Sequence, residues 1–216
     1  MLAYCPLDLP KLEVDEDLVR LFVDEYNPGH HDGIWRTLPL VGRVEKQEDF
    51  LNAVKFEEAW ERRYDYEGNV FYNELARQAL QPIFDHLQLL PMLVTHAQIL
   101  NATRNVPKHH DMKHKKGAFI NNLPRDSYEP GGWKIQLNKT NEQSFFVCKD
   151  WESDPNYIQM PKDTNTFVIN EKSFPHGSDY VEDKCIVSIF GIVRKDEADA
   201  LIKRSEEKYK NYAIWY

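Results

Sequence analysis

Hydrophobic positions in the first part of the chain recur with a helical period. Residues 15–26 predict an amphipathic helix behind an acidic first turn, and its apolar face holds Leu18, Leu21, Phe22 and Tyr26. Residues 71–89 predict a second amphipathic helix, and its apolar positions are Leu75, Ala79, Ile83 and Leu87. Because Pro82 lies inside this second pattern, we expect the helix to kink or break there.

From about Met92 the pattern changes to short strand-like runs separated by Gly, Pro, Asn and Asp. These runs cover residues 93–105, 117–123, 132–138, 144–149, 165–170 and 184–193. Another short strand is expected at 35–44. A charged helix at 197–209 precedes an aromatic tail that should dock on the body, with a partner-binding tail as the alternative. This order predicts a mainly β protein, a sandwich or barrel, with flanking helices that brace one sheet.

The chain length of 216 residues predicts a single domain covering residues 1–216. Within it, residues 1–91 are expected to form a mostly helical N-terminal support, residues 92–194 the β core, and residues 195–216 a closing helix and tail. The chain has 27 Lys and Arg against 35 Asp and Glu, a formal net charge of -8. This acidic balance argues against nucleic acid as the main partner.

The three cysteines show no spacing that indicates disulfides or a zinc site, which favours a reducing compartment. No apolar run approaches the ~18–20 residues needed to cross a bilayer, and the first residues lack the pattern of a signal peptide. We therefore expect a cytoplasmic protein with no membrane partner.

Two near-identical motifs carry candidate metal ligands. His109-His110-Asp111 follows a strand-like run, and residues i and i+2 of a strand point the same way, so His109 and Asp111 can face one metal ion. The similar His30-His31-Asp32 lies in a turn that no strand precedes, and we interpret it as a solvated loop.

A third ligand comes 65 residues after Asp111, where His176 stands in the turn Ser173-Phe-Pro-His-Gly-Ser178 behind an apolar strand. Two histidines and one carboxylate on three facial positions are typical of non-haem Fe(II) oxygenases. His110 should point away from such a metal. A zinc site formed by His110 and His114 at helical spacing is the weaker alternative, because Pro107 and the preceding strand disfavour a helix.

The set of His109, Asp111, His176 and the apolar strand 185–193 resembles the 2-oxoglutarate/Fe(II)-dependent dioxygenase superfamily, closest to its prolyl and aspartyl/asparaginyl hydroxylase-like branches. The resemblance covers residues 93–194. It implies a double-stranded β-helix (jelly-roll) core with His109, Asp111 and His176 as the ligands of Fe(II). It also implies 2-oxoglutarate as co-substrate, dioxygen, and hydroxylation of a small molecule or a protein side chain, with succinate and carbon dioxide as co-products.

The cation for the distal carboxylate of 2-oxoglutarate departs from the family pattern, in which an Arg follows the distal histidine by nine or more residues. At +8 stands Lys184, which shares a strand face with Ser188. Lys184 with Ser188 is the first candidate, and Lys134 and Arg194 are alternatives. A lysine neutralises a carboxylate but cannot form the bidentate contact of an arginine.

Two other interpretations stay open beside the oxygenase. The chain could be a cupin-like jelly-roll that binds metal without turnover, in which the lysine no longer recruits the co-substrate. It could also be a structural domain whose histidines meet by chance. Binding of both Fe(II) and 2-oxoglutarate distinguishes the oxygenase from the other two.

Overall fold

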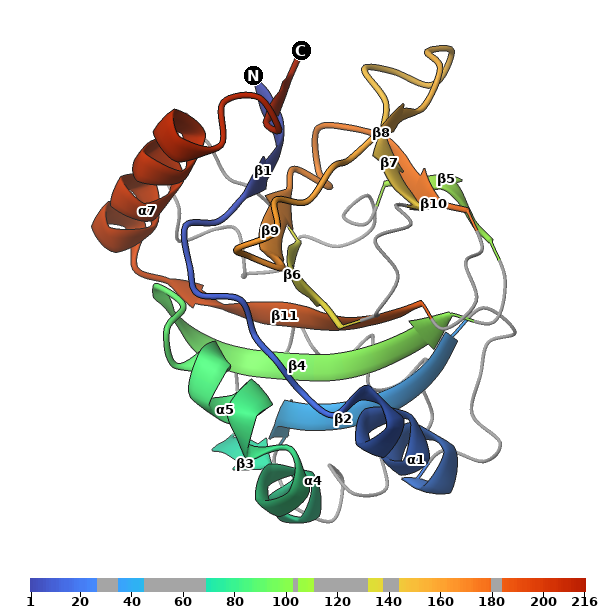
Figure 1. Cartoon of the computed structure of the whole chain (residues 1–216), viewed down its shortest axis with the longest axis vertical. Helices are drawn as coiled ribbons and strands as arrows, with labels where there is room; N and C mark the ends of the chain where they lie inside the picture. Colours follow the sequence, from blue (N-terminus) through green and yellow to red (C-terminus); the bar gives the residue numbers. More distant parts are fainter. Residues whose placement is uncertain (27–34, 45–68, 103–104, 111–131, 138–143, 180–183) are drawn as a thin grey trace.

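Two antiparallel β-sheets face one another, and helices cover the outer face of the larger sheet (Figure 1). This arrangement comes from a computed structural model, which describes residues 1–26, 35–44, 69–102, 105–110, 132–137, 144–179 and 184–216. The protein is therefore mainly β, as the sequence predicts.

The large sheet contains eight of the described strands. Its order is β12 (Ile214–Trp215), β1 (Leu2–Pro6), β9 (Thr166–Ile169), β6 (Trp133–Gln136), β11 (Cys185–Val193), β4 (Met92–Ala102), β2 (Trp35–Val44) and β3 (Asn69–Tyr72). The small sheet contains four, in the order β5 (Val106–His109), β10 (His176–Ser178), β7 (Phe145–Val147) and β8 (Asn156–Tyr157).

From β4 onward the chain passes back and forth between the sheets. Strands β4, β6, β9 and β11 enter the large sheet, while β5, β7, β8 and β10 enter the small one. Most neighbours within a sheet from β4 onward are therefore distant in sequence, β7 and β8 being an exception. This alternation places β10 between β5 and β7, and it brings two histidine-bearing segments side by side.

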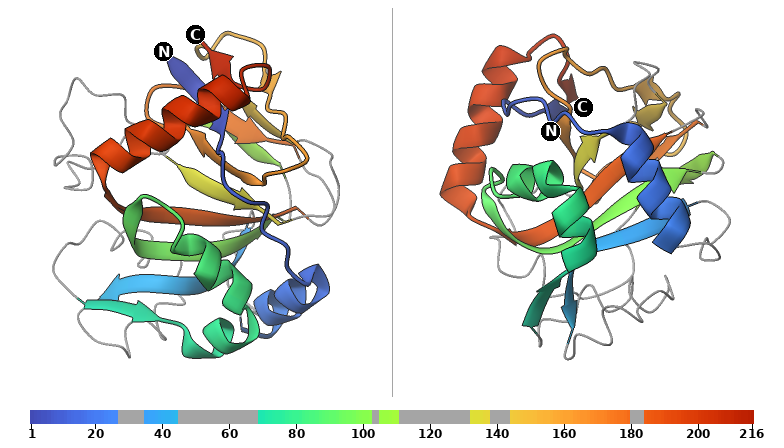
Figure 2. Two further views of the ribbon diagram at one scale, coloured as in Figure 1. Left: turned by 60° about the vertical axis from the view of Figure 1, so that its left-hand side comes forward. Right: turned by 60° about the horizontal axis from the view of Figure 1, so that its bottom comes forward.

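The helices among the described residues are α1 (Glu16–Tyr26), α4 (Glu74–Ala79), α5 (Gln81–Leu87) and α7 (Lys195–Lys208). They lie along one face of the large sheet in both views of Figure 2. Residues of all four helices join one apolar cluster with the outward-facing side chains of β6 and β11, Trp133, Ile135, Val187 and Ile189. This burial on one face holds the helices in place, since apolar area removed from water contributes roughly 25 cal/mol per Å².

A second apolar cluster fills the space between the sheets. Phe167 of β9, Phe145 of β7 and Ile186 of β11 belong to it. The rings of Phe145 and Phe167 lie 5.8 Å apart, and Tyr4 of β1 packs on Phe167 at 5.7 Å. Side chains alternate between the two faces of a strand, and residues paired in register on neighbouring strands share a face. The register partners of Phe167 and Ile186 therefore also point into this interior.

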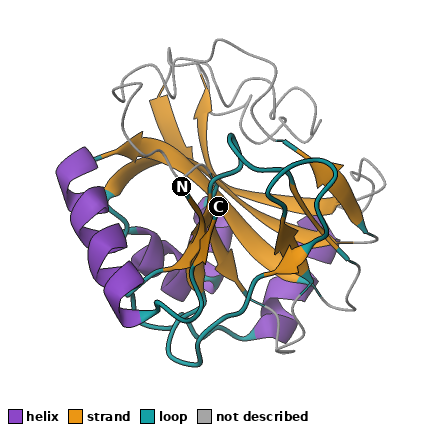
Figure 3. Ribbon diagram, turned by 90° about the horizontal axis from the view of Figure 1, so that it is seen from above, coloured by secondary structure: helices purple, strands orange, loops and turns teal. Residues whose placement is uncertain are grey.

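The two ends of the chain meet beside one another, as the view from above in Figure 3 shows. Strand β12 pairs with β1, and the backbone amide of Tyr216 donates to the carbonyl of Met1 at 3.0 Å. The expected docking of the closing helix and tail on the body is confirmed by α7 and β12.

Several expected elements are confirmed and others need correction. The strand at 35–44 and the break near Pro82 are present, with α4 ending at Ala79 and α5 beginning at Gln81. The expected buried face of α1 is wrong at Leu21, which is 60% exposed, because the helix turns Val19 and Val23 inward instead. The expected strand at 117–123 lies outside the described residues.

Residues 1–91, expected to form a mostly helical support, also contribute strands to the large sheet. Strands β1, β2 and β3 from this part extend the large sheet beside helices α1, α4 and α5. All five residues of β1 are buried, so Leu2–Pro6 lacks the alternation of apolar and polar residues by which a half-exposed strand is recognised.

Among the described residues, no helix combines the length and the apolar character that a membrane-spanning segment requires.

Candidate functional site

Two histidines lie side by side on adjacent strands of the small sheet. His109 ends β5, and its register partner in the antiparallel strand β10 is His176. The two ring centroids are 4.4 Å apart, with an angle of 51° between the ring planes. Residues that are 67 positions apart in sequence therefore form one pair of imidazoles.

Each imidazole is oriented by a backbone carbonyl two residues earlier in the chain. His109 Nδ1 lies 2.7 Å from the carbonyl oxygen of Pro107, and His176 Nδ1 lies 3.3 Å from that of Phe174. A carbonyl oxygen only accepts hydrogen bonds, so in both rings Nδ1 carries the proton and donates it. The lone pair of each ring then lies on Nε2, the arrangement that histidine ligands of metals commonly show.

Gly177 makes the close approach of β5 and β10 possible. A Cβ atom at this position would lie 2.7 Å from the carbonyl oxygen of Val106 and 2.6 Å from Cζ of Phe146. It would also lie 3.1 Å from the carbonyl oxygen of Pro107, which orients His109. The sequence Pro-His-Gly-Ser thus supplies His176 and, at Gly177, the lack of a side chain that lets β5 lie close to β10.

The third expected metal ligand, Asp111, lies outside the described residues, as do His114 and the His30–Asp32 motif. His110 packs its ring edge-on against Trp151 at 5.3 Å, a contact separate from the pair of His109 and His176. Within the described part of the chain, no three His, Cys, Asp or Glu side chains are arranged to hold a metal ion. His109 and His176 therefore provide two donors, and a third has to come from elsewhere.

A buried carboxylate that the sequence analysis missed lies next to His176. Glu171 follows β9, and its Oε1 is 2.5 Å from Nζ of Lys134 and 3.7 Å from Nε2 of His176. The side chains of Glu171 and Lys134 are 0% and 7% exposed. A single glutamate in a loop carries no motif, and only its position directly after an apolar strand and five residues before His176 could have drawn attention to it.

Gly132 accommodates the Glu171 carboxylate at the start of β6. Its backbone N–H donates to Oε2 of Glu171 at 3.2 Å. A Cβ atom on Gly132 would lie 2.2 Å from Cδ of Glu171, so any larger residue would displace the carboxyl group. Gly132 thereby fixes the position of the carboxylate that pairs with Lys134.

Lys184 and Ser188 are both buried at the inner side of the large sheet, and each is 1% exposed. Ser188 is the register partner of Lys134, so their side chains share the inner face of β11 and β6. The ammonium group of Lys184 lies 3.7 Å from the centre of the Phe145 ring. Burial lowers the pKa of Lys184 to about 7, the positive charge of Lys134 lowers it too, and Asp179 acts in the opposite direction.

Ser178 brings a further hydroxyl to this interior. It lies two residues after His176 on β10, pairs in register with Phe145, and is 1% exposed. Among the described residues its Oγ has no hydrogen-bond partner. Its register partner Phe145 is the ring over which the Lys184 ammonium lies.

Arg194, the remaining candidate cation, lies away from Ser188 and its register partner Lys134. It lies beyond the end of β11, where its guanidinium contacts Glu197 at 2.8 Å and the carbonyl oxygen of Leu90 at 3.2 Å. Six residues of extended chain separate it from Ser188, about 20 Å. These contacts favour Lys184 and Lys134 over Arg194 as the cation for a co-substrate.

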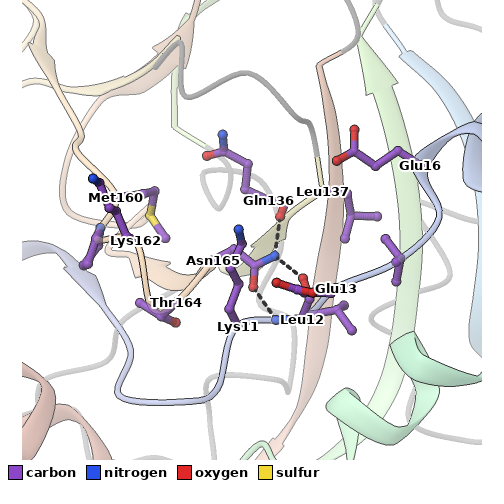
Figure 4. Close-up of a pocket in the computed structure, with 12 residues that line it drawn as sticks. Lys11, Leu12, Glu13, Glu16, Gln136, Leu137, Met160, Lys162, Thr164 and Asn165 are labelled. Atoms are coloured by element: carbon purple, nitrogen blue, oxygen red, sulfur yellow. Dashed lines mark hydrogen bonds between the residues drawn. The ribbon is translucent and has the colours of Figure 1, made fainter.

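A separate pocket of about 500 Å³ opens beyond the other end of β6. Figure 4 shows its lining of mixed charge, with Lys11, Glu13, Glu16 and Lys162 around Asn165. The side chain of Asn165 bonds the backbone of Leu12 and of Gln136, which fixes the wall of the pocket. His109, His176, Lys134 and Lys184 are not among the described residues that line it.

The residues around His176 form a donor set with a definite chemistry. Two imidazoles with lone pairs on Nε2 suit a divalent transition metal, and buried ammonium and hydroxyl groups suit a carboxylate. Of the residues expected from the sequence, His109 pairs with His176, and His176 and Lys134 both lie beside Glu171. Ser188 pairs in register with Lys134, and the Lys184 ammonium lies over Phe145.

No protein-family model and no curated protein matches the sequence. Among solved structures, the chain is similar to an oxidoreductase of the 2OG-Fe(II) oxygenase family from Burkholderia pseudomallei, with 12% identity, a TM-score of 0.36, and coverage of 81% of this chain and 77% of the other.

The chain is also similar to OsALKBH1, with 12% identity, a TM-score of 0.42, and coverage of 88% of this chain and 97% of that protein. A third structure is a prolyl-4-hydroxylase from Pseudomonas putida, with 10% identity, a TM-score of 0.34, and coverage of 88% and 93%. The likeness to these three structures is distant, and it assigns no function to this chain.

Proposed function

We propose that the protein is a non-haem Fe(II), 2-oxoglutarate-dependent oxygenase that hydroxylates a small molecule or a protein side chain. The observation that carries this proposal is the pair of His109 and His176, whose rings lie 4.4 Å apart with both Nδ1 atoms bonded to backbone carbonyls. Histidines oriented in this way present Nε2 to a common ligand.

The iron ligands in this proposal are His109, His176 and Asp111. Asp111 stands two residues after His109, at the spacing that places a carboxylate beside an imidazole at a strand end. Two histidines and one carboxylate leave open positions, as the facial triad of non-haem Fe(II) oxygenases does. When bound, Fe(II) and 2-oxoglutarate supply the activation of dioxygen and the oxidation of a C–H bond, with release of succinate and carbon dioxide.

Lys184 is our candidate for the distal carboxylate of 2-oxoglutarate, with Ser188 as a hydroxyl donor. Both are buried at the inner face of the large sheet, so their interaction with a carboxylate is little weakened by water. Lys134 is less suited to this role because Glu171 already binds its ammonium group at 2.5 Å. The apolar side chains between the sheets, such as Phe145 and Phe167, exclude water from the region.

We propose a double-stranded β-helix (jelly-roll) for the core. Four large-sheet strands in the order β9-β6-β11-β4 and four small-sheet strands in the order β5-β10-β7-β8 support it, together with the passage of the chain between the sheets. Such a core brings the end of β5 and the start of β10 together, the positions of His109 and His176.

The test is anaerobic absorption spectroscopy with Fe(II) and 2-oxoglutarate. A metal-chelated 2-oxo acid gives a visible charge-transfer band, which we expect in the natural protein and not in His176→Ala or Asp111→Ala. His110→Ala is the matched control, because the His110 ring packs on Trp151 and is not one of the proposed iron ligands. This variant should leave the absorption band unchanged.

The outcomes separate the proposed functions. Iron bound with a normal band supports an oxygenase, and succinate release then becomes the readout of a substrate screen. Stoichiometric iron without the band contradicts the oxygenase and favours the cupin-like metal-binding protein. Absence of iron binding, or equal binding by His176→Ala, contradicts the metal site itself.

A further inference from the structure

Glu171 brings a second carboxylate to the site, besides the proposed ligand Asp111. Its Oε1 lies 3.7 Å from Nε2 of His176, the nitrogen that carries the lone pair. Bonds from nitrogen and oxygen ligands to a divalent ion such as zinc are about 2.0–2.2 Å long, so two ligand atoms of one ion lie no more than about 4.3 Å apart. Glu171 and His176 are therefore close enough to bind the same ion.

Glu171 nevertheless does not complete a set of metal ligands in this arrangement. Among the described residues, no three His, Cys, Asp or Glu side chains are placed to hold an ion. Its Oε1 binds the ammonium group of Lys134 at 2.5 Å, and its Oε2 accepts from the backbone N–H of Gly132 at 3.2 Å. A metal ion on Oε1 would lie beside the ammonium group, and the two positive charges would repel each other.

The backbone holds Lys134 and Glu171 against each other. Lys134 lies on β6, which pairs with β9, and Glu171 comes two residues after the end of β9. The side chains are 7% and 0% exposed, so water screens their attraction only weakly. Gly132 leaves the space that the carboxyl group occupies. Of the three groups that contact this carboxylate, Lys134 is the one whose charge opposes a metal ion.

We propose that Lys134 is a positioning residue that keeps the Glu171 carboxylate off the metal ion and so keeps a coordination position open. Two histidines and one carboxylate leave positions free for co-substrate and dioxygen. A second carboxylate on the ion would close one of them and would repel an acidic co-substrate. The inference rests on the proposed function, because it takes His109, Asp111 and His176 as the ligands.

The test is titration of the natural protein and of Lys134→Met with Co(II), whose visible absorption depends on the number and kind of its ligands. We expect Lys134→Met to bind Co(II) at least about tenfold more tightly, the order of change that groups beside metal ligands produce. Its absorption spectrum should also change, because Glu171 becomes a ligand. With Fe(II) and 2-oxoglutarate under anaerobic conditions, the charge-transfer band of Lys134→Met should be weakened or lost.

Matched variants separate the role of Lys134 from a general disturbance of the core. The double variant Lys134→Met, Glu171→Gln removes both charges, and its Co(II) spectrum and affinity should return to those of the natural protein. Lys134→Arg keeps the positive charge and should resemble the natural protein. Glu74→Gln, which alters an exposed ion pair with Arg77, is the surface control. If Lys134→Met does not fold, Lys134→Gln removes the charge but keeps a hydrogen-bond donor, and it should change the spectrum in the same direction.

Failure of the inference and failure of the proposed function give different results. If Lys134→Met binds Co(II) more tightly with an unchanged spectrum, the inference is overturned, because the uncompensated charge alone would explain the affinity. A changed spectrum that persists in the double variant also overturns it, because Glu171 would not be the new ligand. Unchanged affinity and spectrum overturn it while the proposed function stands. If the natural protein binds neither Co(II) nor Fe(II), the proposed function fails.

Discussion

Glu171 and Lys134 form an ion pair that is almost completely buried between the two sheets. Their oxygen and nitrogen atoms are 2.5 Å apart, and the side chains are 0% and 7% exposed. Removing two charges from water is costly, so such a pair is tolerated when each partner compensates the other. The pair also lies beside His176. Loss of either partner would therefore disturb the candidate site as well as the core.

The first prediction concerns this pair. Lys134→Met should lower the free energy of unfolding by about 3–5 kcal/mol, because it leaves the Glu171 charge buried without its cation. Urea unfolding of the metal-free protein measures the change. The double variant Lys134→Met, Glu171→Gln should recover most of this loss. Equal destabilisation by the single and double variants would mean that lost packing, not an uncompensated charge, dominates.

The second prediction concerns the pH dependence of stability. Burial lowers the pKa of Lys184 from its usual 10.5 to about 7. Below pH 7 both folded and unfolded chains carry the charge, and the cost of burying it is fully present. Between pH 7 and 10.5 the unfolded chain binds more protons, so this residue makes the unfolding free energy rise with pH, by at most about 1.4 kcal/mol per pH unit.

Lys184→Met removes this dependence and is the measurement for the second prediction. Unfolding free energies of the natural and variant proteins are compared between pH 6 and 9, and their difference isolates the contribution of Lys184 from that of the other titrating groups. We expect the natural protein to gain on the variant as the pH rises. A difference that stays constant across this range would contradict the lowered pKa.

The third prediction separates Arg194 from the other candidate cations. Arg194→Ala should leave the affinity for 2-oxoglutarate unchanged, because its guanidinium contacts Glu197 and Leu90 at the far end of β11. Its exposed ion pair contributes little, so the loss in unfolding free energy should stay within about 1 kcal/mol. Lys184→Met should weaken 2-oxoglutarate binding at least about tenfold. Weaker binding by Arg194→Ala instead would reverse the assignment.

The spacing of hydrophobic residues is enough to predict the parts of the fold that have long or alternating apolar patterns. The strand 35–44, the apolar strand 185–193 and the break at Pro82 follow from local sequence. The short strands β5 and β10 were not predicted, since β5 contains Pro107 and β10 contains only His, Gly and Ser. Their pairing depends on long-range contacts that no window of sequence contains.

The same division holds for the site. His109, His176, Lys184 and Ser188 were predicted because motif spacing and strand alternation act locally. Glu171 was missed because its importance arises from Lys134, 37 residues earlier in the chain and joined to it only by the pairing of β6 with β9. A buried acid can be recognised as part of a site only when its partner is known.

The fourth prediction tests whether close packing of β5 against β10 keeps the two histidines together. In Gly177→Ala the new Cβ would lie 2.7 Å from the carbonyl oxygen of Val106 and 3.1 Å from that of Pro107. The strands must then separate, and Pro107 is the acceptor that orients His109. We expect a loss of about 1–3 kcal/mol in unfolding free energy, the usual cost of overpacking, together with weaker Fe(II) binding.

Gly191→Ala provides the comparison for Gly177→Ala. Its Cβ would lie 2.3 Å from the carbonyl oxygen of Leu93, at the irregular pairing of β11 with β4 and outside the small sheet. It should destabilise the fold by a similar mechanism without a specific effect on metal affinity. Calorimetric Fe(II) titration under anaerobic conditions, at a temperature where both variants are folded, distinguishes the two. Equal loss of iron affinity in both variants would show that general stability, and not the spacing of β5 and β10, controls the site.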